Sequence, residues 1–166
     1  MLPSVTSRLN SSLPAIAVDP SLAFERPETR AAAAYWTALR GHRAMPFRQD
    51  LKPSVMRAYL PFVNLVDVDF ERGSYRVSLQ GAHTGQVFGN LRGRRFSDLF
   101  PPDVAERWRG CFHLVRDTAK PVRLSTAVGT QGQVWLQCEV LIAPLRNSAE
   151  AMQLGSLFWV FVSWEP

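Results

Sequence analysis

The sequence contains few cysteines and histidines, and it lacks the motifs that many enzymes carry. Its two cysteines, Cys111 and Cys138, lie far apart and form no CxxC pair, whereas a structural zinc site normally needs four closely spaced ligands. The three histidines form no HExxH motif, and neither a GxSxG elbow nor a phosphate loop is present. We therefore interpret the cysteines as reduced thiols of the core and expect no metal site.

No segment of the sequence has the length and apolar character of a membrane span. The longest apolar run, Leu157 to Val162, is far shorter than the ~20 residues that cross a bilayer. Residues 1–20 also lack the basic start and apolar centre of a secretory signal. We expect a cytoplasmic protein that does not contact membranes.

The composition is typical of one globular domain. Of 166 residues, 46% are hydrophobic and 20% charged, which excludes wholesale disorder. The net charge is +5, so a nucleic acid or an acidic partner is one hypothesis. Basic residues concentrate from Arg40 to Arg57 and at Arg92, Arg94 and Arg95. Neither stretch is interleaved with stacking aromatics or resembles a recognition helix, so a solvated face or a protein-docking surface is the alternative.

The first third of the chain predicts an arm, a helix and a hairpin. Residues 1–28 are rich in serine and proline and predict a flexible arm. Residues 29–40 predict a helix that ends at Gly41 and has one apolar face. Residues 62–68 and 74–80 predict two strands of an antiparallel hairpin. The apolar positions of the helix are Ala32, Tyr35, Trp36 and Leu39.

The rest predicts short turns, one long helix and three strands. Residues 82–100 contain three glycines and predict short helical turns. Asp103 and Glu106 have the spacing of a capping box, which would open a helix that Pro121 stops. Residues 122–128, 134–142 and 154–164 predict strands, with a turn at Gln131–Gly132 and Pro144 ending the second strand. This order predicts an α+β domain over residues 29–166, with its core in residues 60–164.

We expect a five-stranded antiparallel sheet whose central strand is the last one, because that strand is apolar almost without interruption. The middle helices should form a belt over one face. The N-terminal helix should cover part of the other face or an edge.

An ordered set of short motifs runs through the first hundred residues. They are Tyr35-Trp36, Leu39-Arg40-Gly41, Met45-Pro46, Asp50, Leu60-Pro61, Val66-Asp67-Val68, Tyr75-Arg76, Gly81, Gly89, Leu91, Gly93-Arg94 and Asp98-Leu99-Phe100. This set resembles the PAS_5 family of stand-alone proteobacterial PAS domains. The resemblance covers about residues 30–164 and implies a sensory or interaction module in signal transduction, without catalytic residues to carry over. Ala82-His83 departs from the small hydroxyl residue expected after Gly81.

A PAS-like belt and sheet enclose an apolar pocket, which either holds a small apolar ligand or is filled by packed side chains. The belt and the long helix should supply Val87, Phe88, Phe96, Leu99, Trp108, Cys111, Phe112 and Val115. The sheet should supply Leu79, Leu136, Cys138 and Phe158.

Three polar residues are candidates for a role at that pocket. His83 is a candidate haem ligand or a pH-sensitive hydrogen-bonding group. Cys111 is a candidate flavin-adduct cysteine, although no flavin-binding motif surrounds it, and His113 is expected on the flank of the long helix. The sequence requires no cofactor, and both haem and flavin are disfavoured.

The function that we expect is regulation through a signalling protein partner, a homodimer or both, in a protein without enzymatic activity. Tyr35, Trp36 and Leu39 are the candidate dimer surface, and Arg92, Arg94 and Arg95 are candidates for a partner surface. The alternatives are the basic nucleic-acid or acidic-partner binder and a small pocket enzyme. In the enzyme, Asp67, Asp69 and His83 would form an acid–base set.

Overall fold

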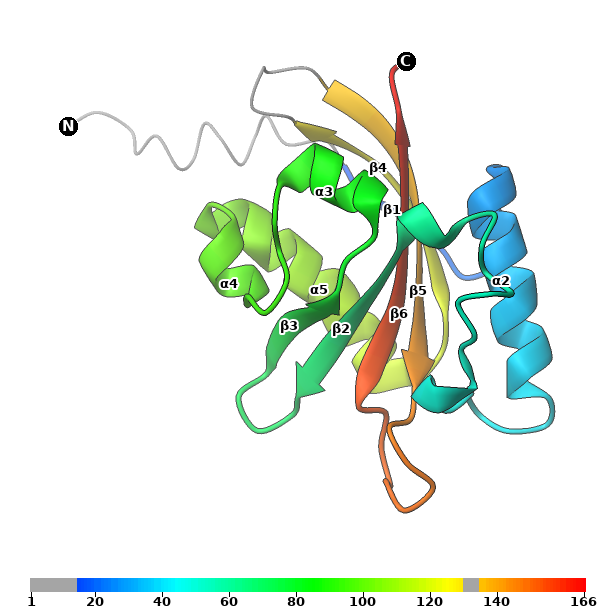
Figure 1. Ribbon diagram of the computed structural model, residues 1–166. Helices are drawn as coiled ribbons and strands as arrows, with labels where there is room; N and C mark the ends of the chain where they lie inside the picture. Colours follow the sequence, from blue (N-terminus) through cyan, green and yellow to red (C-terminus); the bar gives the residue numbers. More distant parts are fainter. Residues whose placement is uncertain (1–14, 130–134) are drawn as a thin grey trace.

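The computed structural model describes residues 15–129 and 135–166 and contains one antiparallel sheet with helices on both faces (Figure 1). The sheet has six strands in the order β1-β4-β5-β6-β2-β3. The elements are β1 Ala17–Asp19, α2 Pro27–Arg40, η1 Arg48–Asp50, η2 Leu60–Phe62, β2 Val63–Asp69, β3 Ser74–Leu79, α3 Ala82–Phe88, α4 Phe96–Leu99, α5 Pro102–Thr118, β4 Val122–Gly129, β5 Trp135–Leu145 and β6 Ser156–Trp164.

The expected α+β fold and the central position of the last strand are confirmed, since β6 pairs with both β5 and β2. The sixth strand corrects the sequence analysis. Residues 17–19, which we assigned to a flexible arm, pair with β4 as an edge strand, and Phe24 is buried. Residues 1–14 of the predicted arm and the predicted turn at Gln131–Gly132 lie outside the described residues.

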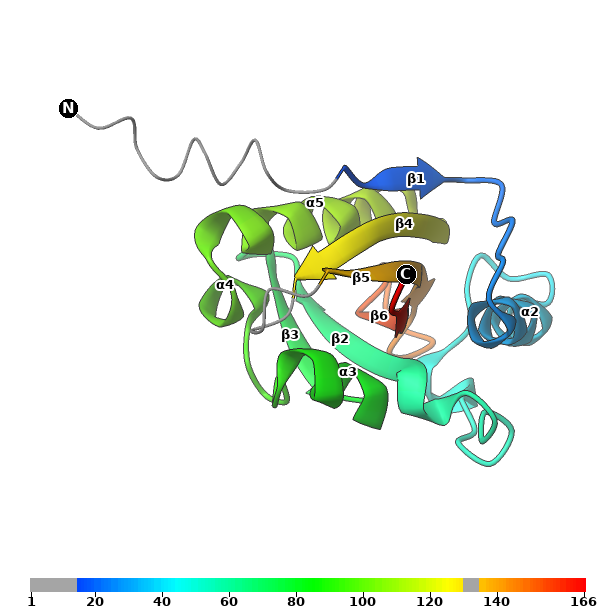
Figure 2. The same ribbon diagram turned by 90° about the horizontal axis from the view of Figure 1, so that it is seen from above.

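Strand β6 is covered from both sides. Helices α3, α4 and α5, here called the belt, lie against one face of the sheet, and α2 lies on the other, outer face (Figure 2). Trp159 and Phe161 contact belt aromatics, whereas Phe158 and Val160 alternate to the outer face. The whole run from Ser156 to Val162 is therefore buried, as its sequence predicts.

Helix α2 is fixed to the outer face by Trp36. This side chain is only 2% exposed, and its indole N–H donates to the carbonyl oxygen of Pro144 at 3.0 Å. Pro144 lies inside β5 instead of ending it, which corrects the sequence prediction. Strand β4 begins at Val122, opposite Ile142, so it does not reach Pro144. Among the described residues no strand pairs with the side of Pro144 that faces away from β6, and the missing N–H of this proline is tolerated there.

Helix α5 begins differently from its prediction. Its N-cap is Pro101, and no side chain caps it, so the expected capping box of Asp103 and Glu106 does not form. Pro102 occupies the first turn, where its fixed φ and absent N–H are both compatible with a helix. The helix ends at Thr118, before left-handed Ala119.

Gly81 joins the hairpin to the belt through a close backbone approach. The side chain of Asn64 on β2 accepts from the Gly81 N–H at 2.9 Å and donates to the carbonyl of Trp159 on β6 at 3.1 Å. A Cβ at Gly81 would lie 2.2 Å from the carbonyl oxygen of Pro61 and 2.8 Å from that of Val63. Only glycine fits between these backbone atoms.

We expect Gly81→Ala to lower the free energy of unfolding by about 3 kcal/mol, because the clash is with backbone that cannot move aside. Gly85→Ala is the matched control. Its Cβ would meet nothing closer than 3.9 Å within α3, so helix propensity should raise stability by about 0.5–1 kcal/mol. Urea unfolding of both variants measures the difference, and equal stabilities would contradict this account.

Candidate functional site

Aromatic side chains fill the space between the belt and the sheet. Phe96 of α4 lies 4.8 Å from Phe112 and 5.3 Å from Trp159, measured between ring centroids. Trp108 of α5 lies 5.5 Å from Trp159 and 6.2 Å from Phe161. Edge-to-face pairs at such distances add about 0.5–1.5 kcal/mol each to the burial of their area. The centre of the expected pocket is therefore a packed aromatic core.

Most of the predicted pocket residues lie on this side of the sheet. Phe96, Trp108, Cys111, Phe112, Val115 and Cys138 are buried in the core. Val87, Phe88, Leu99 and Leu136 are partly buried and pack against it.

Leu79 and Phe158 are corrections to the predicted pocket. Phe158 precedes Trp159, so strand alternation turns it to the outer face, and Leu79 lies on that face with 41% of its surface exposed. Trp159 and Phe161 belong to the core instead and were missed. The continuous apolar run of β6 has no period-two signal that would separate its two faces.

An open groove lies at the end of this core, between α5 and the β4–β5 pair. It has a volume of about 440 Å³ and is mostly apolar, with Arg107 on its border. Two of the predicted pocket residues, Phe88 and Trp108, contribute to its wall. We call it the belt groove; its other apolar lining residues include Ile16, Phe100, Val104, Val128 and Trp135.

His83 lies where the sequence placed it, at the start of the belt, and its ring packs on Phe62 with centroids 4.7 Å apart. Its Nε2 accepts from the backbone N–H of Ser163 at 3.2 Å and lies 2.8 Å from the Ser163 hydroxyl oxygen. Burial lowers the pKa of His83, which favours the neutral ring that these contacts require. Iron ligation through Nε2 would have to break both contacts.

Cys111 and Cys138 are buried thiols. Burial raises the pKa of Cys111 to about 11 and that of Cys138 to about 12, so both are protonated and weakly nucleophilic at neutral pH. His113 lies on the flank of α5, as expected, and its Nδ1 forms a short hydrogen bond with the Tyr75 hydroxyl. Burial and the nearby Arg116 and Arg109 lower the pKa of His113.

The residues of the proposed acid–base set do not come together. Asp67 forms an ion pair with Arg48 on the outer face, and Asp69 lies near Arg72 at the hairpin end of β2. His83 lies on the belt side against Ser163. Within residues 15–129 and 135–166, no group of three or more His, Cys, Asp or Glu residues could hold a metal ion.

A comparison with protein families agrees with this architecture. PAS_5, described as a PAS domain, matches residues 24–158. The chain belongs to this family. Searches among curated proteins and among solved structures found no match. The resemblance found in the sequence is thus confirmed over most of the chain, and no helix in the described part of this PAS domain is long and apolar enough to span a bilayer.

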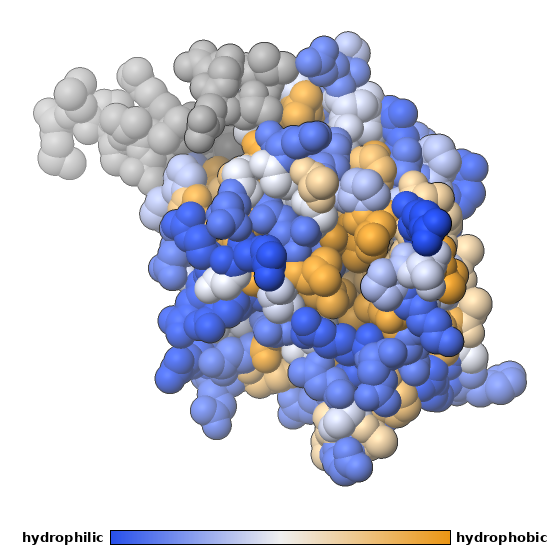
Figure 3. All heavy atoms as spheres, viewed as in Figure 1, coloured by the Kyte–Doolittle hydropathy of each residue, from blue (hydrophilic) through white to orange (hydrophobic). Residues whose placement is uncertain are grey.

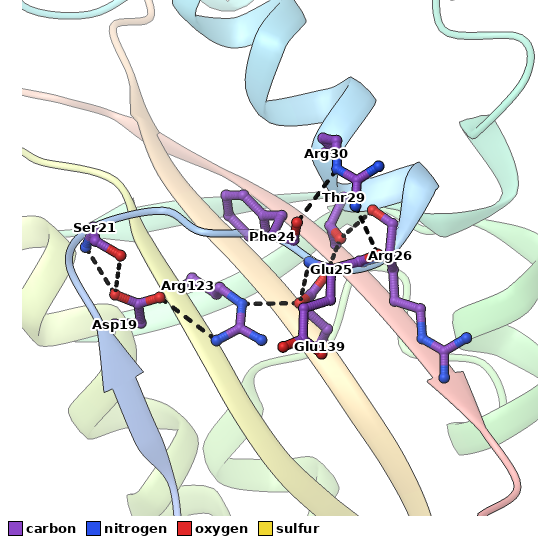
Figure 4. A network of polar contacts seen from close by, with 9 residues as sticks. All are labelled: Asp19, Ser21, Phe24, Glu25, Arg26, Thr29, Arg30, Arg123 and Glu139. Carbon is purple, nitrogen blue, oxygen red and sulfur yellow. Dashed lines mark hydrogen bonds and ion pairs between the residues drawn. The ribbon is translucent and has the colours of Figure 1, made fainter.

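A buried carboxylate holds α2 on the outer face of the PAS sheet (Figure 4). Glu139 of β5 is 1% exposed and accepts from the backbone N–H groups of Glu25 and Arg26, both at 2.9 Å. It also accepts from the Thr29 hydroxyl and, at 2.8 Å, from Arg123 Nε. Because α2 has no capping side chain of its own, Glu139 supplies the anion at its N-terminus. We call this set the α2 anchor.

Glu139 is not among the residues that the sequence singles out, so the α2 anchor was missed. An acid within an alternating strand is usually solvated, and only the folded chain brings residues 25–29 to it. The hydrogen bonds lower the pKa of Glu139 although burial acts in the opposite direction as the largest single effect. Arg26 also lies over the Trp164 ring, 3.4 Å from its centroid.

The side chains of the predicted dimer surface pack within the same chain. Trp36 is buried, and Leu39 is half-buried. The Tyr35 hydroxyl accepts from the backbone N–H of Lys52 at 2.9 Å, which ties it to the connector after α2. The expectation that Trp36 contacts a second copy is therefore wrong for this arrangement of α2, because the apolar face of the helix packs against the sheet.

The two basic stretches meet on the outer face. Two adjoining hollows of about 460 and 600 Å³ share Pro53, Leu60 and Leu79 in their walls. Arg57 comes from the first basic stretch and Arg92 from the second, and both line the larger hollow. We call the two hollows together the outer groove; Figure 3 shows an apolar depression on this face with hydrophilic side chains around it.

Replacement of Glu139 by Gln should lower the free energy of unfolding by about 2–4 kcal/mol, because the partly buried Arg123 and two backbone N–H groups lose their anion. Glu150→Gln, in an exposed loop, is the control and should stay within about 0.5 kcal/mol of the parent.

The same pair of variants tests the pH dependence. The pKa of Glu139 is lower in the folded chain than its ordinary 4.5, so its stabilisation is complete above about pH 4.5 and disappears as the pH falls through the folded value. The Gln variant should lose this part of the acid slope in unfolding titrations between pH 7 and about pH 3. A parallel slope in parent and variant would contradict the assignment.

Proposed function

We propose that this PAS domain is a regulatory module of the cytoplasm that binds a signalling protein, and that it does so through the outer face of its sheet. The observation that carries the proposal is the division of that face. Helix α2 covers β5 and β6, whereas the part at β2 and β3 holds the open outer groove. Leu79 is 41% exposed there, and nearby Val55 is 57% exposed.

In this module, the signal would be transmitted by a change in the position of α2 on the sheet. Its anchor is a few hydrogen bonds to one carboxylate, and Trp36 makes one more to Pro144. A signal that favours an arrangement without these bonds would enlarge the exposed part of the outer face, and a partner that prefers one arrangement would shift the balance toward it. The packed aromatic core keeps the sheet itself unchanged.

Site-specific photo-crosslinking tests the partner function. A photoreactive amino acid at Leu79, introduced in cells that naturally contain this protein, should give adducts with a second protein. The same amino acid at Leu114, which is exposed on α5, is the control and should give none. An absence of adducts at Leu79, or equal adducts at both positions, would contradict the proposal.

Ligand binding is a second candidate function, which the belt groove favours. Its volume of about 440 Å³ and apolar walls suit a small apolar metabolite, and it adjoins the aromatic core that the family fold places under the belt. This site replaces the centre of the predicted pocket, where aromatic rings now lie.

The fluorescent probe anilinonaphthalene sulfonate should bind the parent protein at the belt groove. Val104→Trp fills the groove and should weaken binding about tenfold, because the probe loses its apolar contact area. Leu114→Trp, on the exposed side of the same helix, should leave binding unchanged. Probe binding that Val104→Trp does not weaken would place the ligand elsewhere.

A further inference from the structure

The edge of β3 beside the outer groove is already occupied, which limits how a partner can bind. The backbone N–H of Val77 donates to the carbonyl of Arg94 at 3.1 Å, and its carbonyl accepts from Gly93 at 2.7 Å. The Gln80 side chain holds the same segment through Gly89 and Leu91. A partner strand therefore finds no free ladder at these positions, and contact must come through side chains. A helix laid in a groove binds in this way.

The charged residues at the outer groove determine which charge the bound helix must carry. Arg57 and Arg92 are both exposed on the larger hollow, and Arg48 borders the smaller one. Among the described residues that line the two hollows, none is Asp or Glu. Arg48 is engaged by Asp67 behind it and by the Ser78 and Ser156 hydroxyls, which leaves the other two arginines to face a partner.

The wall of the groove is apolar, which favours a protein over a nucleic acid. Leu60 and Leu79 belong to both hollows, and Leu65 and Met56 belong to the smaller one. A nucleic acid gains most of its affinity from phosphate contacts and has no aliphatic side chains to cover these leucines. An amphipathic helix presents one apolar and one charged face at once.

We propose that the outer groove binds an acidic amphipathic helix of the partner protein. The apolar face of that helix packs on Leu60 and Leu79, and its Asp and Glu side chains pair with Arg57 and Arg92. This inference rests on the proposed function, because it names the chemistry of the partner segment. In this proposal, Arg57 from the first basic stretch and Arg92 from the second form one binding surface.

The test uses the complete purified protein and a synthetic amphipathic helical peptide whose polar face consists of Glu. A counterpart with Lys at the same positions is the control peptide. The Glu peptide should bind, with amide chemical shift changes around Leu60 and Leu79, and its affinity should fall as salt rises. The Lys peptide should bind at least about tenfold more weakly.

Matched variants locate the contact. Arg57→Glu, Arg92→Glu and Leu79→Asp should each weaken binding of the Glu peptide about tenfold. Arg94→Glu makes the same charge change outside the groove lining, and Leu114→Asp makes the same apolar-to-acid change on α5, so both should bind as the parent does. Circular dichroism of each variant confirms that it is folded.

Several outcomes would overturn the inference while the proposed function stands. They are equal binding of both peptides, unchanged binding by the Arg57 and Arg92 variants, or crosslinks from Leu79 to a partner segment that is not acidic. A single-stranded oligonucleotide that binds at the groove in place of the peptide would assign it to nucleic acid. A monomer–dimer balance that Leu79→Asp shifts in sedimentation would assign it to a second copy. The absence of any crosslinked partner contradicts the proposed function itself.

Discussion

The structure depends on the burial of β6 from both sides. A strand that is apolar on both faces needs two covering layers, and here one is the belt and the other is α2. The belt layer is held by aromatic packing, which is non-directional and spread over many contacts. The outer layer is held at one end by a carboxylate with directed hydrogen bonds. The two layers therefore differ in how they would respond to a local change.

That difference agrees with the roles proposed for the two layers of this PAS domain, in which α2 transmits the signal and the aromatic core keeps the sheet unchanged. An aromatic core loses stability gradually as single contacts change, whereas a hydrogen-bonded anion is either satisfied or costly to bury. In that proposal the outer layer is the one that changes its arrangement, and it lies beside the outer groove. Signal and partner would then act on the same face of the sheet.

The sequence predicted the order of the elements and the central place of β6, because apolar periodicity and proline and glycine positions are local signals. It could not predict that residues 17–19 form a strand, since three residues carry too little pattern and the pairing with β4 is long-range. It misplaced Phe158 for lack of an alternating signal. The role of Glu139 and the position of Arg57 and Arg92 on one hollow both depend on contacts between segments that are distant in the sequence. No local sequence pattern therefore predicts them.

Strand β1 has a consequence for the behaviour of the chain in concentrated solution. Together with the segment that pairs with β3 at Val77, it covers part of the outer backbone ladder of the sheet, including residues 123–125 of β4. Unprotected strands of this kind recruit one another and seed fibrous aggregates. A chain shortened to begin after Asp19 would lose this pairing along β4, and its tendency to aggregate would rise with protein concentration.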